Sequence, residues 1–191
     1  RSPITLPDEL SPVTIPPDKC LDQMLDSGEL DAVIWASEPP SFRRKSENVR
    51  RLFPDFKEVE IDYFRRTGIF PIMHTVVIKR DIYERHPWVA ASLYKAFDAA
   101  KSDAIWRQHD MGCLFSMLPW IRLYNEEQEL LMGEDPFAYG LESNRNVLET
   151  FLKYMLDQKL IKSPLSVEEL FAKETHQMKD VRMSSQTTQR P

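Results

Sequence analysis

Apolar residues are concentrated in short runs separated by polar turns, and the first clear pattern lies near the amino end. Residues 13–15 are β-prone, and residues 19–26 carry apolar positions at helical spacing behind a capping Asp18. Gly28 follows this predicted helix in the place where glycine commonly ends one. Residues 30–36 then form a nearly continuous apolar run, typical of a strand buried on both faces of a parallel sheet. The pattern predicts a strand, helix, strand unit with a right-handed crossover.

Further apolar patterns follow in the middle of the chain. A short helix is expected at residues 48–53, and the alternation of residues 59–64 predicts another strand. The apolar stretch from Gly68 predicts a buried strand that ends where Asp81 caps a short helix. Pro87 suits the first turn of a long helix over residues 88–108. Its apolar stripe is expected to face a core and comprises Trp88, Val89, Leu93, Ala96, Phe97, Ala100 and Ala104.

The remainder of the chain is predicted to be helical up to a polar tail. Three helices are expected, at residues 126–132, 144–158 and 167–172. Ser143 and Ser166 precede the last two as caps, and Ser166 with Glu169 three residues later matches a capping box. Residues 176–191 are polar with scattered apolar positions, so they are not expected to fold.

Composition narrows the class of protein. With 191 residues, 42% of them hydrophobic and 29% charged, the chain suits one globular domain or two small lobes. Its net charge of −5 lacks the basic excess of nucleic-acid-binding proteins, and it has no apolar run of the roughly 18 residues that a membrane span needs. Cys20 and Cys113 fit no metal-binding spacing, so free thiols in a reducing compartment and no metal site are expected.

Two groups of motifs resemble a known family. The run Leu25-Asp-Ser-Gly-Glu-Leu-Asp-Ala-Val-Ile-Trp-Ala-Ser-Glu-Pro39 resembles the helix, glycine, strand and Glu-Pro loop of type II periplasmic-binding-like proteins. More narrowly, three segments resemble the 4,5-dihydroxyphthalate decarboxylase family: Gly68-Ile-Phe-Pro-Ile-Met-His-Thr-Val-Val-Ile-Lys-Arg-Asp81, Tyr139-Gly-Leu-Glu-Ser-Asn-Arg145 and Glu168-Glu-Leu-Phe171. The resemblance implies a two-lobed α/β fold with the ligand held in the cleft between the lobes.

The resemblance also implies how the chain is divided. Members of the family are longer and begin with a first lobe that is not found in this sequence, so a partial fold is expected. The end of a second α/β lobe would cover residues 1–66, a hinge-crossing strand residues 67–80, a helix-rich return residues 81–175, and a tail residues 176–191. A cytoplasmic location is expected, or a periplasmic one if the full-length gene carries a signal peptide. A homo-oligomer is left open.

Two titratable side chains are the candidate catalytic residues. Ligands of open α/β sheets collect outside the carboxyl ends of strands, and Ser37, Glu38 and Pro40 directly follow such a predicted end. Glu38 is a candidate proton donor or acceptor, with a solvated loop carboxylate as the alternative. His74 suits acid–base chemistry because its ordinary pKa of about 6.5 lets it give and take protons near neutrality. The alternative for His74 is a hydrogen-bonded core residue.

A dicarboxylate ligand needs fixed cations and a surface for its ring. Arginine suits bidentate capture of a carboxylate, although basic doublets are often solvated surface. Aromatic side chains can stack on the ring or simply pack in a core. The candidate substrate-binding residues are Ser37, Pro40, Arg43, Arg44, Tyr63, Arg65, Arg66, Phe70 and Thr75.

Three functions are left open by the sequence. The resemblance implies non-oxidative decarboxylation of 4,5-dihydroxyphthalate to protocatechuate and CO2, without an organic cofactor, with Glu38 and His74 as the acid–base pair. A solute-binding protein of the ABC-transporter type, for a small carboxylated or aromatic ligand, would use the same cleft without chemistry. The third possibility is that the chain is an inactive fragment and only interacts with another chain.

Overall fold

The computed structural model describes residue 10 and residues 12–110, 112 and 115–179. The chain divides into two compact units, Arg1–Gly68 (unit 1) and Ile69–Pro191 (unit 2). The described residues form seven α-helices and three short 3₁₀-helices, and no strand is found among them. No helix in these ranges has both the length and the apolar character needed to cross a bilayer.

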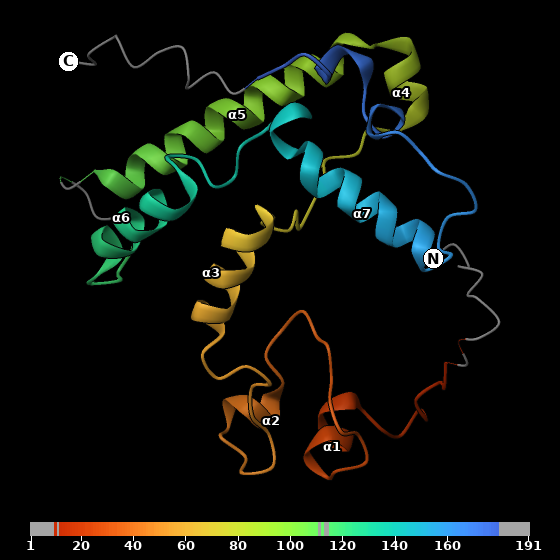
Figure 1. Ribbon diagram of the computed structural model, residues 1–191, viewed down its shortest axis with the longest axis vertical. Coiled ribbons are helices and arrows are strands. Elements are labelled where there is room, and N and C mark those ends of the chain that lie inside the picture. Colours follow the sequence, from red (N-terminus) through yellow and green to blue (C-terminus); the bar gives the residue numbers. More distant parts are fainter. Residues whose placement is uncertain (1–9, 11, 111, 113–114, 180–191) are drawn as a thin grey trace. The chain divides into compact units, whose positions relative to one another are not determined.

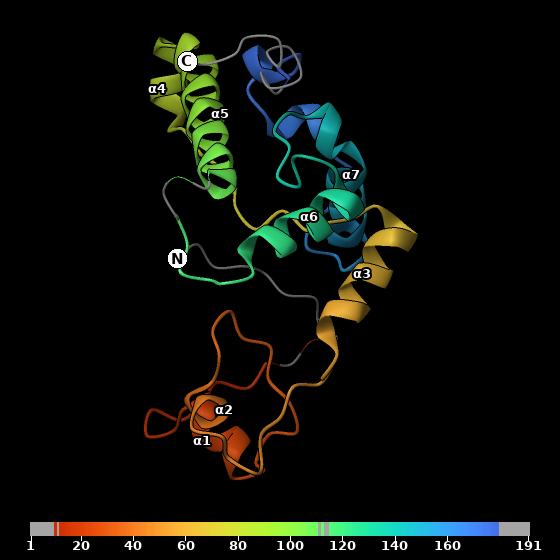
Figure 2. The same ribbon diagram turned by 90° about the vertical axis from the view of Figure 1, so that its left-hand side faces the viewer.

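Unit 1 holds three helices, α1 (Leu21–Asp26), α2 (Pro40–Arg43) and α3 (Phe56–Thr67). Helices α1 and α2 pack side by side, as both ribbon views show (Figures 1 and 2). Asp22 of α1 accepts two hydrogen bonds from Ser41 of α2, from the hydroxyl at 2.5 Å and from the backbone N–H at 2.8 Å. Ser41 is fully buried and Asp22 nearly so. A buried polar contact therefore joins these two helices.

A second carboxylate, Asp26, extends the same contact. Its side chain accepts hydrogen bonds from the Ser46 hydroxyl and from Arg44, and its backbone carbonyl accepts one from Asn48 at 2.9 Å. Hydrogen bonds from Ser41 hold the pKa of Asp22 below its ordinary value, and the bond from Ser46 does the same for the pKa of Asp26. Both carboxylates are thus held in their charged form by the residues that they join.

Unit 2 is built around the long helix α5 (Trp88–His109). Helix α4 (Arg80–Arg85), helix α6 (Ile121–Met132) and the short η3 (Lys173–Thr175) all contact α5 (Figure 1). The hydroxyl of Tyr83 in α4 donates to Glu174 in η3 at 2.7 Å. A second group comprises η1 (Glu142–Asn144), α7 (Arg145–Asp157) and η2 (Val167–Leu170), with α7 contacting both short helices.

The second group carries the apolar core of unit 2. Leu141, Leu148, Leu152 and Val167 are buried together, with Ile161 and Phe171 packed against them. Leu148 and Leu152 lie four residues apart on α7, so they share one face of the helix. Ser166 forms the predicted capping box with Glu169, whose carboxylate accepts the Ser166 N–H at 2.7 Å. That cap fixes the entry of Val167 into the core.

A buried ionic cluster joins α5 to the loop before η1. The Lys101 ammonium donates to Asp135 at 2.6 Å and to the Phe137 carbonyl at 3.2 Å, and it lies 3.6 Å from Asp98. It also lies 4.1 Å from the centroid of the Tyr139 ring. The sequence prediction that large apolar residues of α5 face the core is wrong for Trp88 and Phe97, which are exposed. The helix instead buries Ala90 and Asp98. Asp98 belongs to the ionic contact that Lys101 makes with the loop.

The predicted long helices are confirmed, and several local predictions are wrong. Residues 59–64 lie inside α3 and do not form a strand, and the half-buried Ile61 and Phe64 stand at helical spacing. Residues 48–53 are not helical, since Asn48 is bonded to the end of α1. The proposed caps Asp18, Asp81 and Ser143 are replaced by Cys20, Lys79 and Asn144, none of which makes a side-chain cap hydrogen bond.

The strands predicted at residues 13–15 and 30–36 lie in non-helical segments of the structure, without a strand ladder. The same holds for the hinge-crossing strand predicted at residues 67–80, except that Thr67 ends α3 and Arg80 begins α4. The α/β fold of the periplasmic-binding type therefore stays a proposal. Of the predicted tail, residues 180–191 lie outside the described residues, as does Cys113, while Cys20 is a free and exposed thiol.

Candidate functional site

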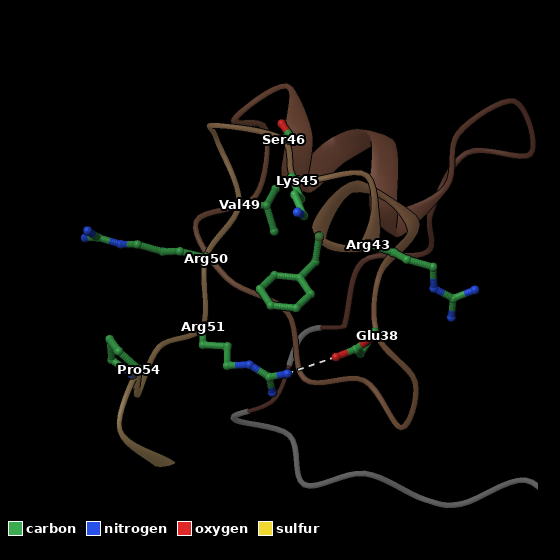
Figure 3. A pocket seen from close by; sticks show the side chains of 9 residues that line it. Glu38, Arg43, Lys45, Ser46, Val49, Arg50, Arg51 and Pro54 are labelled. Carbon is green, nitrogen blue, oxygen red and sulfur yellow. Dashed lines mark hydrogen bonds and ion pairs between the residues drawn. The ribbon is translucent and has the colours of Figure 1, made fainter. Parts of the chain in front are cut away.

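Unit 1 contains a solvent-open pocket with a volume of about 630 Å³ (Figure 3). It lies between the start of α2 and the segment that leads toward α3. Its lining carries four cationic side chains and one carboxylate in a chain whose overall net charge is −5. The lining residues are Glu38, Phe42, Arg43, Lys45, Ser46, Val49, Arg50, Arg51 and Pro54.

Two local features of the sequence shape this pocket. Pro40 stands at the first position of α2, where a missing N–H costs nothing and the fixed φ suits a helix. Lys45 adopts a left-handed backbone conformation with φ of 60°, which turns the chain back just after α2. The turn is held by the hydrogen bond from the Ser46 hydroxyl to Asp26. The turn thereby brings the basic segment after Lys45 back toward Glu38, and both line the pocket.

Arg51 is the best-held cation of the pocket. Its guanidinium donates to the Glu38 carboxylate at 2.9 Å, the ion pair drawn in Figure 3. It also lies 4.9 Å from the ring centroid of Phe42 and 4.9 Å from that of Phe56. Stacking of a guanidinium on aromatic rings is attractive and restricts the side chain. Both members of the ion pair remain about half exposed, so a ligand can reach them.

The charge of the pocket determines which ligands it suits. Arg43, Lys45, Arg50 and Arg51 together attract anions, and guanidinium groups bind carboxylates with paired hydrogen bonds. The side chain of Phe42 supplies an apolar surface among these cations. The arrangement suits a small molecule that combines carboxylates with an aromatic ring, and Glu38 adds one group able to exchange a proton.

Of the residues predicted for the site, Glu38 and Arg43 line this pocket. Ser37 directly precedes Glu38 and Pro40 follows it by two residues, and both are exposed. Arg44 is directed to Asp22 and Asp26, whose hydrogen bonds and charges raise its pKa. In the structure Arg44 thus supports the contact between α1 and α2.

Three predicted residues lie on α3 and do not line the pocket. Tyr63, Arg65 and Arg66 are exposed, and Arg66 pairs with Asp62 one turn earlier at 2.8 Å. The Tyr63 carbonyl accepts a hydrogen bond from the Thr67 hydroxyl at 2.7 Å, near the end of the helix. Their predicted role in substrate binding has no structural support within unit 1.

The remaining predicted residues belong to the segment that opens unit 2. His74 and Thr75 are exposed there, and Phe70 packs edge-on against Phe137 with ring centroids 5.5 Å apart. Glu38 belongs to unit 1 and His74 to unit 2. Their pairing as acid and base therefore stays a prediction.

Sequence reasoning missed Lys45, Arg50, Arg51 and the two rings that flank Arg51. The available signal was the high density of basic residues between Arg43 and Arg51, with Phe42 before this segment and Phe56 after it. The incorrect prediction of a helix at residues 48–53 obscured this signal, because a helix would point these side chains in different directions around its axis. Across the described ranges, no group of three or more His, Cys, Asp or Glu side chains is arranged to hold a metal ion.

Comparison with known proteins gives one informative similarity. No family model matches the chain. Over 168 residues, 88% of its length, the chain is 33% identical to a protein of Comamonas testosteroni named 4,5-dihydroxyphthalate decarboxylase. The match covers 51% of that protein, so the chain spans about half the length of the curated relative. This similarity supports the 4,5-dihydroxyphthalate decarboxylase family, which the motifs of the chain resemble.

Proposed function

We propose that the chain is part of a carboxy-lyase that removes CO2 from 4,5-dihydroxyphthalate or a closely similar aromatic dicarboxylate, forming protocatechuate from the former. The observation that carries the proposal is the 33% identity to the Comamonas decarboxylase over 88% of the chain. The basic pocket of unit 1 supports it, because its cations and its aromatic surface match the two chemical features of such a substrate.

The chemistry of the substrate defines what the site must provide. Each carboxylate of 4,5-dihydroxyphthalate has a hydroxyl para to it on the ring. Removal of the proton from that hydroxyl moves electron density to the ring carbon that bears the carboxylate. Protonation of this carbon interrupts aromaticity, and loss of CO2 restores it. The reaction needs one base at the hydroxyl and one acid at the ring carbon.

We assign the acid–base pair to Glu38 and His74 without fixing which residue takes which role. Glu38 lines the pocket, so its carboxylate is within reach of a bound ring. The pocket cations would hold the carboxylate that is retained in the product and orient the ring for proton transfer at one position. His74, in the exposed segment of unit 2, would supply the second proton transfer.

Binding without chemistry is the second candidate function. It is favoured by one observation: Glu38 is already paired with Arg51 in the structure, an arrangement that serves recognition as well as catalysis. A solute-binding protein for an aromatic carboxylate would need the same cations and ring surface, and no proton transfer.

One experiment separates the two functions. The chain is incubated with 4,5-dihydroxyphthalate, release of CO2 and protocatechuate is followed, and affinity is measured in parallel. We expect turnover that Glu38→Gln and His74→Ala each reduce by at least about a hundredfold while binding is kept. Binding without product at high protein concentration would contradict the enzyme and leave the binding protein.

A further inference from the structure

We propose that Arg51 is the residue that binds the ligand carboxylate, and that Glu38 is an internal competitor which the ligand displaces from it. The inference deepens the proposed use of this pocket for an aromatic carboxylate and rests on it. It adds two roles that are absent from the sequence-based list of site residues: a specific anchor, and an exchange of ion-pair partners at that anchor.

The choice of Arg51 among four cations follows from how its side chain is held. Phe42 and Phe56 lie on the guanidinium at equal distances of 4.9 Å, so its position is largely fixed before any ligand arrives. A pre-positioned side chain loses less conformational entropy on binding than a free one. The side chains of Arg43 and Arg50 extend to opposite sides, away from the Glu38–Arg51 pair (Figure 3). They supply charge to the pocket without a defined point of contact.

The competition follows from the contact between Arg51 and Glu38. The carboxylate of Glu38 uses a donor of the guanidinium, with N and O 2.9 Å apart, which a ligand carboxylate would also use. Both side chains are half exposed, and ion pairs of that kind are weak. A ligand with two carboxylates can therefore replace Glu38 at a cost of at most about fivefold in affinity.

The exchange also links recognition to the chemistry of the site. When a ligand carboxylate takes Arg51, the carboxylate of Glu38 is released beside the bound ring. Glu38 would then weaken binding while being available for proton transfer. Removing its charge should therefore improve affinity and impair turnover, which are opposite effects of one substitution.

The test measures binding alone. Isothermal titration calorimetry is carried out on this chain with phthalate, which has both carboxylates but lacks the hydroxyls that the reaction requires. Arg51→Gln should weaken binding at least about tenfold, since a charge-assisted hydrogen bond is lost, and Arg51→Lys should weaken it less. Glu38→Gln should tighten binding by up to about fivefold. In the Arg51→Gln background, Glu38→Gln should give no tightening, because the competed contact is gone.

Matched controls separate the specific contact from general electrostatics. Arg50→Gln removes the same charge from the pocket lining and should weaken binding clearly less than Arg51→Gln does, because Arg50 contributes only its charge. Glu47→Gln removes a carboxylate outside the lining and should leave affinity unchanged. Far-ultraviolet circular dichroism confirms that each variant keeps the helical content of the unmodified chain.

The outcomes are decisive in both directions. Wild-type affinity in Arg51→Gln, weaker binding in Glu38→Gln, equal tightening in both backgrounds, or no phthalate binding by any variant would each overturn the inference. None of these results depends on CO2 release. Failure of the decarboxylase assay together with the expected affinity changes would reject the proposed reaction and keep the anchor.

Discussion

In unit 1 the most deeply buried side chains are polar: Asp22 and Ser41 bond to each other where α1 meets α2. Unit 2 also buries polar groups, in the ionic cluster of Asp98, Lys101 and Asp135, but it holds in addition an apolar cluster around Leu148 and Leu152. Apolar burial depends on area removed from water and on close packing, and it is largely independent of pH. A hydrogen-bonded carboxylate contributes only while it is charged. The two units should therefore be destabilised by different changes.

The same contrast bears on function. The candidate pocket lies beside the contact of α1 and α2, which depends on ionised side chains, and Ser46 belongs both to the pocket lining and to the contact with Asp26. A change that weakens this contact should alter the pocket before it alters the core of unit 2. Stability and ligand binding are thus expected to be coupled in unit 1 and separate from the packing of α7.

The largest effect is expected from Leu148→Ala in the apolar cluster. Leu148 is 7% exposed, and removing a buried leucine costs about 3 kcal/mol of the free energy of unfolding through lost burial and a residual cavity. Urea denaturation followed by the circular dichroism of the chain measures the change. Amide hydrogen exchange should increase in residues 141–171 and stay unchanged in residues 20–46.

Leu130→Ala is the matched control for that substitution. The same side chain is removed from α6, where Leu130 is 90% exposed, so the free energy of unfolding should change by less than about 0.5 kcal/mol. Equal effects of the two substitutions would show that the cluster around Leu148 does not stabilise unit 2.

The second prediction concerns the polar contact of unit 1. Asp22→Asn keeps the shape of the side chain and replaces a charged acceptor of two hydrogen bonds with a neutral one. Amide exchange of α1 and α2 should accelerate by about two- to tenfold, because hydrogen bonds to a charged acceptor are the stronger kind. Exchange of α7 should not change. Accelerated exchange in α7 would mean that the two units are not stabilised independently.

The third prediction is the pH dependence of unit 1. Asp22 and Asp26 have lower pKa values in the folded chain than the ordinary 3.8, so the unfolded chain binds more protons between the two values. Their contribution is complete above about pH 5, where the carboxyls of the unfolded chain are also ionised, and is lost as the pH falls through the lowered, folded-state pKa. The protection of the α1 and α2 amides, which is the intrinsic exchange rate divided by the observed rate at the same pH, should decrease in that acid range. In the double variant Asp22→Asn, Asp26→Asn this acid step should disappear.

How far the sequence predicts the fold depends on element length. The long periodic segments of α5 and α7 are predicted, since a 3.6-residue pattern over several turns has no strand alternative, whereas for α6 only its second half, residues 126–132, is predicted. The six residues at positions 59–64 fit the two-residue period of a strand as well as the 3.6-residue period of a helix. The strand prediction is wrong because these residues lie within the longer helix α3. Helix α2 is not among the predicted elements, because the resemblance implies a Glu-Pro loop at this point, whereas Pro40 starts the helix.

The candidate site is predicted only in part for a similar reason. Glu38 and Arg43 are adjacent to a recognisable Pro-Pro loop, so local sequence identifies them. The partner of Glu38 is Arg51, thirteen residues later, and their contact depends on the left-handed turn at Lys45. Lysine rarely adopts that conformation, so no propensity rule indicates the turn. A contact created by one unusual backbone angle is not visible in residue periodicity.

The smallest effect is expected from an exposed carboxylate of unit 2. Arg145 pairs with Glu142 at 2.5 Å and with Glu168 at 2.6 Å, and these neighbours raise its pKa while the pKa of each carboxyl is lowered. Glu168→Gln replaces a carboxylate with an amide, as Asp22→Asn does, but at an exposed position. Exposed ion pairs are screened by water and salt, and Glu142 still holds Arg145. Amide exchange of η2 should therefore change less than about twofold, and 0.5 M NaCl should remove the difference. An exchange-rate change as large as that expected for Asp22→Asn would show that an exposed carboxylate stabilises its surroundings as much as a buried one. Burial of the carboxylate would then not explain the difference between the two units.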